Sequence, residues 1–130
     1  MNDFKKQSIW VKSIDNANIE IKCWSLNGAS FIWNVYANIY ESHKLFNDIE
    51  KALTAPFYGG CTYDKIVTYS PAQGIKYDWQ KEGKALKIGC DYNHLGDNYF
   101  NSCDTEYGIP DQILNDCNEL INFLNRCNDE

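Results

Sequence analysis

Arginine is nearly absent from this 130-residue chain, in which Arg126 stands alone beside 11 lysines. The guanidinium group is the usual fork for guanine edges and phosphates, so its scarcity argues against direct reading of DNA or RNA. The net charge of −6 argues in the same direction, because nucleic-acid binders usually carry a basic patch. We therefore expect no direct nucleic-acid partner.

Export signals and long apolar runs are missing as well. The segment from Met1 to Lys6 has no apolar signal core, and no stretch approaches the length of a membrane span. We expect a cytoplasmic protein without a membrane partner, whose thiols stay reduced. No CxxC pair is present, which argues against a zinc ribbon or a thioredoxin-like site. The six cysteines are Cys23, Cys61, Cys90, Cys103, Cys117 and Cys127.

Alternation of apolar and polar residues predicts two strands, over residues 18–25 and 31–40. The second strand also carries the β-branched and aromatic residues typical of strands. Asn27-Gly28 between them is a strong hairpin signal, so the strands are expected to pair antiparallel. The apolar face of the second strand, expected to point toward the C-terminal helix, comprises Phe31, Trp33, Val35, Ala37 and Ile39.

The remaining periodic segments are shorter. Residues 1–17 show little period and at most a short strand, and residues 47–55 predict a short helix that ends at Pro56. Its inward residues would be Ile49, Ala52 and Leu53. Further short strands are predicted over residues 61–63, 66–69, 77–80 and 85–90, with a turn at 70–74.

Helical periodicity is clearest at the C-terminus. Pro110 suits a first helical turn, and a helix over about residues 110–126 is predicted from the spacing of Ile113, Cys117, Leu120, Ile121 and Leu124. A sheet of hairpin-connected strands needs cover on one face, and this helix supplies it. We predict an α+β fold, an antiparallel sheet of short strands covered by one long C-terminal helix, in a single domain over residues 1–130.

A candidate site lies where the strand at residues 85–90 runs into a loop. Asp91, His94 and Asp97 fall within seven positions there, and loops that follow strands are common places for sites. If the strands at 61–63 and 85–90 are neighbours, Gly59, Gly60 and Tyr63 join these residues in one pocket. Glycine then leaves room, and backbone N–H groups and carboxylates offer anion and hydroxyl recognition.

Several interpretations of this loop stay open. The aspartates could accept backbone N–H bonds in turns, with His94 as a structural residue. Asp91, His94 and Asp97 could instead hold a divalent metal with Cys90 or His43, although their spacing matches no standard motif. A Cys–His nucleophile pair is a further alternative. We favour ligand recognition without a metal or cofactor, with His43 added to the ligand-binding candidates.

Three segments give the chain a resemblance to a family of small, uncharacterised tailed-phage proteins over about residues 31–125. Residues 59–63 (Gly-Gly-Cys-Thr-Tyr) are similar to the family's His-Gly-Gly-x-Thr-Tyr segment, with Tyr58 in the place of its histidine. Residues 89–97 are similar to its Gly-x-Asp-x-x-His-x-Gly-Asp segment. Residues 42–46 are similar to its Gly-His-Pro-Leu-Tyr piece, with Lys44 in the place of proline. The resemblance implies a phage or prophage origin and no settled activity.

The function that we expect follows from this context. Small cytoplasmic phage proteins without DNA-binding features are often antagonists of host defence, so we expect a protein in the host cytoplasm that sequesters a small nucleotide immune signal, of the cyclic-nucleotide or ADP-ribose type. A hydrolase of such a nucleotide, with His94 as general acid or base, is the alternative. An inhibitor that binds a host protein through its acidic surface, and a homo-oligomer, also remain open.

Overall fold

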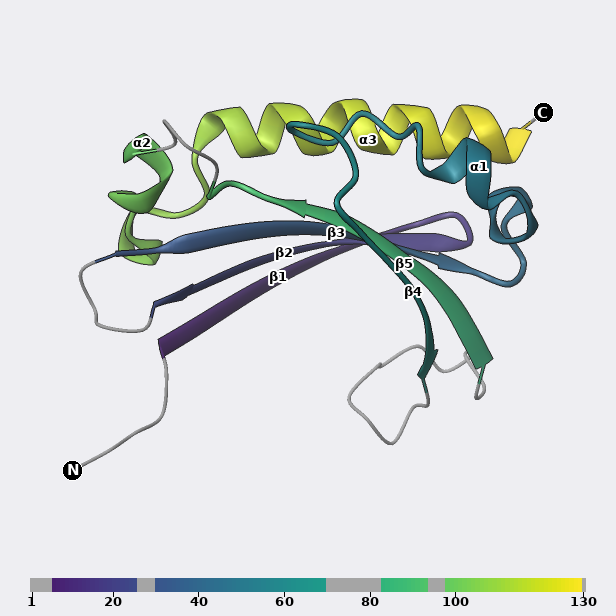
Figure 1. Cartoon of the computed structure of the whole chain (residues 1–130), viewed down its shortest axis with the longest axis horizontal. Coiled ribbons are helices and arrows are strands. Elements are labelled where there is room, and N and C mark those ends of the chain that lie inside the picture. Colours follow the sequence, from purple (N-terminus) through teal and green to yellow (C-terminus); the bar gives the residue numbers. More distant parts are fainter. Residues whose placement is uncertain (1–5, 26–29, 70–82, 94–97, 130) are drawn as a thin grey trace.

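The computed structural model describes residues 6–25, 30–69, 83–93 and 98–129. They form a five-stranded antiparallel sheet in the order β1-β2-β3-β5-β4, and the helix α3 (Asp111–Asp129) lies along one face of it (Figure 1). The predicted α+β fold is confirmed. The strands are β1 (Lys6–Ile14), β2 (Ala17–Ser25), β3 (Ile32–Tyr40), β4 (Tyr63–Tyr69) and β5 (Gly83–Asp91).

The apolar face of the sheet packs under α3 as predicted. Trp33 and Val35 of β3 are buried, and Ile21 and Cys90 stand on the same face because each of them is paired with Val35 across a strand boundary. The indole N–H of Trp33 donates to the carbonyl of Cys103 at 3.1 Å. From the helix, the predicted stripe fills the opposite side of this core, with Ile113, Cys117, Leu120 and Leu124 buried.

The N-terminal segment is longer and more regular than its sequence indicates. β1 has nine residues and pairs with β2 through a tight turn at Asp15-Asn16, where Asn16 has a φ of 63°. Alternation is hidden because β1 carries apolar side chains on both faces, with Trp10 toward α3 and with Ile9 and Val11 exposed on the other side. Because this edge strand does not have one apolar and one polar face, its sequence lacks the alternation that marks the inner strands.

The helix predicted over residues 47–55 is wrong in length and partly in orientation. The chain forms a 3-10 turn, η1 (Lys44–Asn47), and a single α-helical turn, α1 (Ile49–Ala52). Asp48 separates the two, because its carboxylate caps α1 by accepting the N–H of Lys51. So short a helix buries only Ala52, while Ile49 and Leu53 are exposed.

The strands that follow confirm part of their predictions. Residues 63–69 form one strand, β4, where two shorter ones are predicted, and β5 covers the predicted strand at 85–90. The β2–β3 pair is antiparallel as predicted. Its Asn27-Gly28 turn lies outside the described residues, as do the turn predicted at 70–74 and the strand predicted at 77–80.

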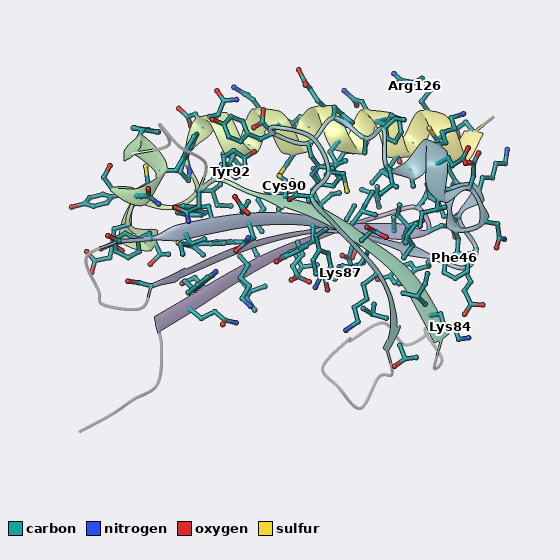
Figure 2. All side chains as sticks on the ribbon, in the orientation of Figure 1. Phe46, Lys84, Lys87, Cys90, Tyr92 and Arg126 are labelled. Carbon is teal, nitrogen blue, oxygen red and sulfur yellow. The ribbon has the colours of Figure 1, made fainter. Side chains whose placement is uncertain are left out.

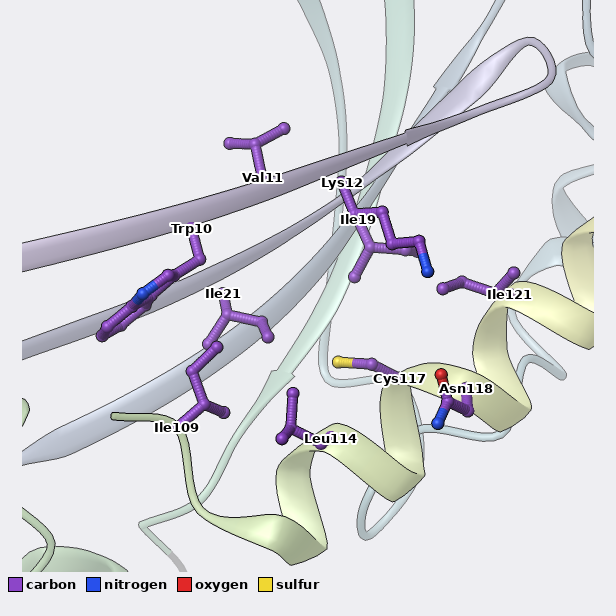
Figure 3. Close-up of a pocket in the computed structure, with 10 residues that line it drawn as sticks. All are labelled: Trp10, Val11, Lys12, Ile19, Ile21, Ile109, Leu114, Cys117, Asn118 and Ile121. Carbon is purple, nitrogen blue, oxygen red and sulfur yellow. The ribbon is translucent and has the colours of Figure 1, made fainter. Parts of the chain in front are cut away.

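None of the six cysteines takes part in a disulfide. That their thiols stay reduced in the cell remains a prediction. Figure 2 shows Cys90 and Tyr92 on the α3 side of the sheet and Lys87 on the other side. Within the described ranges, no helix combines the length and apolar character needed to cross a membrane. A groove of about 280 Å³ runs between β1, β2 and α3, and its lining residues include Trp10, Ile21, Leu114 and Ile121 (Figure 3).

Candidate functional site

The pairing of β4 with β5 brings two predicted site segments to the same end of the sheet. Tyr63 stands opposite Gly89, and the N–H of Thr62 donates to the carbonyl of Gly89 at 2.9 Å. Because the strands run antiparallel, the chain before β4 and the chain after β5 leave the sheet together. The condition on which the predicted pocket depends, that these two strands are neighbours, is therefore met. The pocket itself stays a prediction.

The glycine pair before β4 makes a tight turn. Gly59 and Gly60 have φ values of 70° and 89°, which other residues rarely adopt, and both are exposed. The N–H of Gly60 donates to the carbonyl of Phe57 at 2.9 Å, so this group closes the turn and is not presented to an anion. The turn also places Tyr58 so that its ring stacks on the ring of Tyr92, with the two centroids 4.6 Å apart.

Asp91 and Tyr63 both lie on the face of the sheet that points away from α3, which we call the open face. No helix in the described part of the chain lies over it (Figure 1). The carboxylate of Asp91 accepts the N–H of Asn93 at 3.0 Å, the turn-forming bond expected of an aspartate at the end of a strand. The ring of Tyr63, 39% exposed, meets the ring of Tyr36 edge to face at 5.5 Å.

His43 is not brought to this face. It is buried on the α3 side, where its Nε2 lies 3.0 Å from the carbonyl of Leu124 and its Nδ1 accepts the N–H of Leu45 at 3.0 Å. These partners require the proton on Nε2, so the neutral ring donates to Leu124. Burial lowers the pKa of His43 and favours that neutral form. His43 therefore holds η1 against α3.

Two predicted site residues, His94 and Asp97, lie outside the described residues. Their convergence with Asp91 stays a prediction. Among the residues that the structure describes, no three His, Cys, Asp or Glu side chains gather so that they could hold a metal ion.

The most developed part of the open face surrounds Tyr36, a residue outside the predicted set. A Cβ on Gly89 would lie 2.4 Å from Cδ1 of Tyr36, so glycine is what allows the ring to cross β5 toward Tyr63. The ammonium of Lys87 lies 4.4 Å from the centroid of the Tyr36 ring. Burial first, and then the charge of Glu20, raise the pKa of Tyr36, which keeps its hydroxyl protonated at neutral pH.

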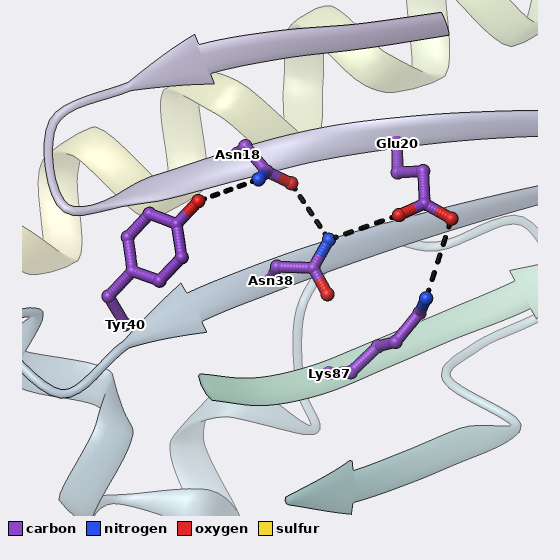
Figure 4. A network of polar contacts seen from close by, with 5 residues as sticks. All are labelled: Asn18, Glu20, Asn38, Tyr40 and Lys87. Atoms are coloured by element: carbon purple, nitrogen blue, oxygen red, sulfur yellow. Dashed lines mark hydrogen bonds and ion pairs between the residues drawn. The ribbon is translucent and has the colours of Figure 1, made fainter. Parts of the chain in front are cut away.

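Polar side chains continue along the open face as one hydrogen-bonded network (Figure 4). The amide of Asn18 donates to the hydroxyl of Tyr40 at 2.7 Å, and the amide of Asn38 donates to Asn18 at 2.8 Å and to Glu20 at 3.4 Å. The other carboxylate oxygen of Glu20 lies 3.4 Å from Nζ of Lys87. The network fixes side chains on β2, β3 and β5 relative to one another.

Register adds a second lysine to this face. Lys65 of β4 stands directly opposite Lys87 of β5, so the two side chains share the open face. The ammonium of Lys87 extends across β3 toward Glu20 and lies over the ring of Tyr36, so it points away from Lys65. Lys65 is exposed.

Beyond Tyr36 the open face is hollowed between β1, β2 and β3. The hollow has a volume of about 360 Å³, and the amide oxygen of Asn34 in it accepts the indole N–H of Trp24 at 3.0 Å. Aromatic, amide and ammonium groups are thus combined in one open recess. It is lined by Gln7, Lys22, Trp24, Asn34 and Tyr36.

Two buried thiols, those of Cys90 and Cys117, are poorly suited to nucleophilic catalysis. Burial raises the pKa of Cys90 to about 12 and that of Cys117 to about 12, so both stay protonated at neutral pH. Cys90 therefore lacks the thiolate form that a nucleophile requires. Tyr92 is likewise committed, since its buried hydroxyl donates to Asp116.

The sequence carries a signal for the open face. The polar side of β3, with Asn34, Tyr36 and Asn38, alternates as clearly as its apolar side, and Gly89 inside a strand marks a close approach of another group. Which residues meet across strands depends on register, and no local pattern encodes the pairing of Lys65 with Lys87. No protein-family model matches the chain, and neither a curated protein nor a solved structure matches it. What the chain binds must therefore be inferred from its own residues.

Proposed function

We propose that the chain binds a small nucleotide-type ligand on the open face of its sheet. The observation that carries the proposal is the position of the aromatic pair Tyr36 and Tyr63 one step along the strands from the lysine pair Lys65 and Lys87. Paired residues in adjacent rows of one face lie two residues apart, about 7 Å along a strand. A nucleotide presents a ring and a phosphate at comparable separation.

The aromatic pair supplies the stacking surface. Tyr36 is held in place by Tyr63, Lys87 and the absent side chain of Gly89, so little freedom remains to be lost when a base stacks. Tyr63 is partly exposed and offers its ring at the sheet surface. Base–aromatic stacking contributes about 1–3 kcal/mol per base in proteins that bind nucleic acid.

The lysine pair supplies the anion site. A phosphate beside Tyr36 would accept a charge-assisted hydrogen bond from Lys87, whose ammonium lies over that ring, and the exposed Lys65 of the neighbouring strand adds a second positive charge to the same face. The ion pair of Lys87 with Glu20 keeps that ammonium in position without covering Lys65. Asn34 and Asp91, paired with each other one row further along, add amide and carboxylate groups that recognise hydroxyls or base N–H groups.

Within this proposal the protein sequesters the ligand and does not cleave it. Cys90 and Cys117 are protonated, and His43 is committed to structural hydrogen bonds, so none of these three groups is available as a nucleophile or a general base. We extend the proposal to a phage counter-defence role, in which the ligand is a cyclic-nucleotide or ADP-ribose-type immune signal. The hydrolase alternative depends on His94 and is decided by the state of the recovered ligand.

Isothermal titration calorimetry with a panel of cyclic dinucleotides and cyclic ADP-ribose species tests the proposal. Tyr63→Ala should weaken binding by roughly 5- to 150-fold, which is the stacking contribution expressed as a ratio. Lys65→Gln should weaken it by about tenfold or more through loss of a charge-assisted bond. The matched controls, Tyr107→Ala and Lys44→Gln, change exposed residues of the same types outside the sheet and should bind normally.

The bound ligand is then recovered after heat denaturation and examined by mass spectrometry. Recovery of the intact nucleotide supports sequestration, whereas a cleaved product supports the hydrolase. Failure of the whole panel to bind, or equal affinities for the Tyr63 variant and its Tyr107 control, would contradict the open-face site.

A further inference from the structure

We propose that two copies of the chain associate through β1, which pair antiparallel about a two-fold axis and join the two sheets. Within the described residues, β1 pairs only with β2, so its outer edge presents backbone N–H and C=O groups. An exposed edge of this kind is a ready template for another strand. The association is independent of the ligand site proposed above.

The side chains of β1 favour a partner over water. Ile9 and Val11 are 50% and 55% exposed and stand on the same face of the strand. On the other face, the groove beside Trp10 is lined largely by apolar side chains, among them Ile21 and Leu114 (Figure 3). An edge strand that stays unpaired usually carries charges or proline at such positions. β1 carries such a charge, Lys12 at the margin of the groove, but it exposes the apolar Ile9 and Val11 on its other face.

Its sequence is self-complementary in one register. β1 runs over Lys6–Ile14, so an antiparallel pair centred on Trp10 uses all nine residues of both copies. In this register, Ile9 of one copy stands opposite Val11 of the other, and Lys12 stands opposite Ser8. No lysine faces a lysine across the pair. The four exposed apolar side chains then form one cluster on the open side of the joined sheet.

Neighbouring registers are worse. A pair centred on Ile9 leaves the last two residues of β1 unpaired, and a pair centred on Lys12 places that residue opposite itself. A pair centred on Val11 leaves the first two residues of β1 unpaired. Of these registers, only the one centred on Trp10 pairs the whole length of β1 and places no lysine opposite another lysine.

This register also determines where the helices lie. Residues directly opposite in an antiparallel pair point to the same face, so both copies of α3 stand on one side of the joined sheet. The grooves beside the two copies of Trp10 then adjoin the shared strand boundary. Leu114, which is exposed in the single chain, borders that groove.

The opposite edge of the sheet provides a matched control. β4 is also unpaired on its outer side within the described residues, but it has seven residues against nine in β1, and its charges, Asp64 and Lys65, are adjacent and of opposite sign. Ile66 in β4 is 49% exposed, close to the exposure of Val11. Val11→Lys and Ile66→Lys are thus the same kind of change at the two edges. Neither residue is buried, so neither change should unfold the chain.

Sedimentation equilibrium of the full chain tests the proposal. Wild type should have the mass of two chains, Val11→Lys the mass of one, and Ile66→Lys the mass of two. The Val11 substitution enters the interface twice and places each new ammonium group opposite Ile9. Hydrogen exchange should show the β1 amides protected in wild type and less protected in Val11→Lys, with unchanged far-UV circular dichroism. A wild-type mass of one chain at all concentrations would overturn the proposal, and so would a Val11→Lys dimer or dissociation by Ile66→Lys.

Discussion

Substitution of Gly89 by alanine tests the construction of the open face through stability alone. The new Cβ would lie 2.4 Å from Cδ1 of Tyr36 and 2.6 Å from the carbonyl oxygen of Val35. Both distances are far inside van der Waals contact. The ring cannot simply move aside, because it meets Tyr63 on one side and the ammonium of Lys87 on its face. The carbonyl belongs to the backbone of β3 and moves only with that strand.

The cost can be estimated from these contacts. Overpacking of a well-packed site costs about 1–3 kcal/mol, and a clash with backbone as well as side chain places Gly89→Ala toward the upper part of that range. For a chain of this length, 1 kcal/mol corresponds to a change in Tm of about 3–5 °C. We expect Gly89→Ala to lower Tm by about 6–15 °C in thermal unfolding followed by circular dichroism.

A double-mutant cycle identifies the source of the loss. If the ring of Tyr36 causes most of the strain, Tyr36→Ala should cost less in the Gly89→Ala background than in wild type, with a coupling energy of about 1 kcal/mol. Additive effects would place the strain at the carbonyl of Val35 instead. A change in stability below about 0.5 kcal/mol for Gly89→Ala would refute the packing of Tyr36 over Gly89.

Three further predictions concern stability. Burial lowers the pKa of His43 in the folded chain below its ordinary value of 6.5. Below pH 6.5 the unfolded chain therefore binds more protons than the folded chain, and the free energy of unfolding should fall as the pH drops. His43→Gln should reduce this pH dependence in urea titrations. Tyr92→Phe should cost about 1–2 kcal/mol, since it removes the bond to Asp116 and keeps the ring, whereas Tyr107→Phe on an exposed residue should cost nothing measurable. Gly60→Ala should lower the free energy of unfolding by about 1 kcal/mol in a denaturant melt. The added Cβ would meet no atom within 4 Å, so the loss comes from the φ of +89° alone, and an unchanged stability would contradict that φ.

The parts of the fold that the sequence predicts are those with a clear period. β2, β3 and α3 each bury one face, so hydrophobic alternation or a helical stripe marks them. β1 escapes this test because it is an edge strand with apolar groups on both faces. The segment after β3 escapes it because Asp48 caps a new helix within what looks like a continuous one.

The candidate site divides in a similar way. The sequence allows the strands that became β4 and β5 to be neighbours without requiring it, and the structure pairs them. The role of His43 is not predictable, because a histidine that caps one element and donates to another has no local signature. The open face around Tyr36 depends on register, which long-range pairing determines and which local periodicity does not contain.

The most direct test of the ligand site is a nuclear magnetic resonance titration of the labelled protein with the panel of cyclic dinucleotides and cyclic ADP-ribose species. We predict that a binding member shifts the amide signals of Tyr36, Tyr63, Lys65 and Lys87, while signals from the buried side of α3 stay in place. Shifts confined to α3 and the groove beside β1, or no shift with any member of the panel, would contradict a nucleotide site on the open face.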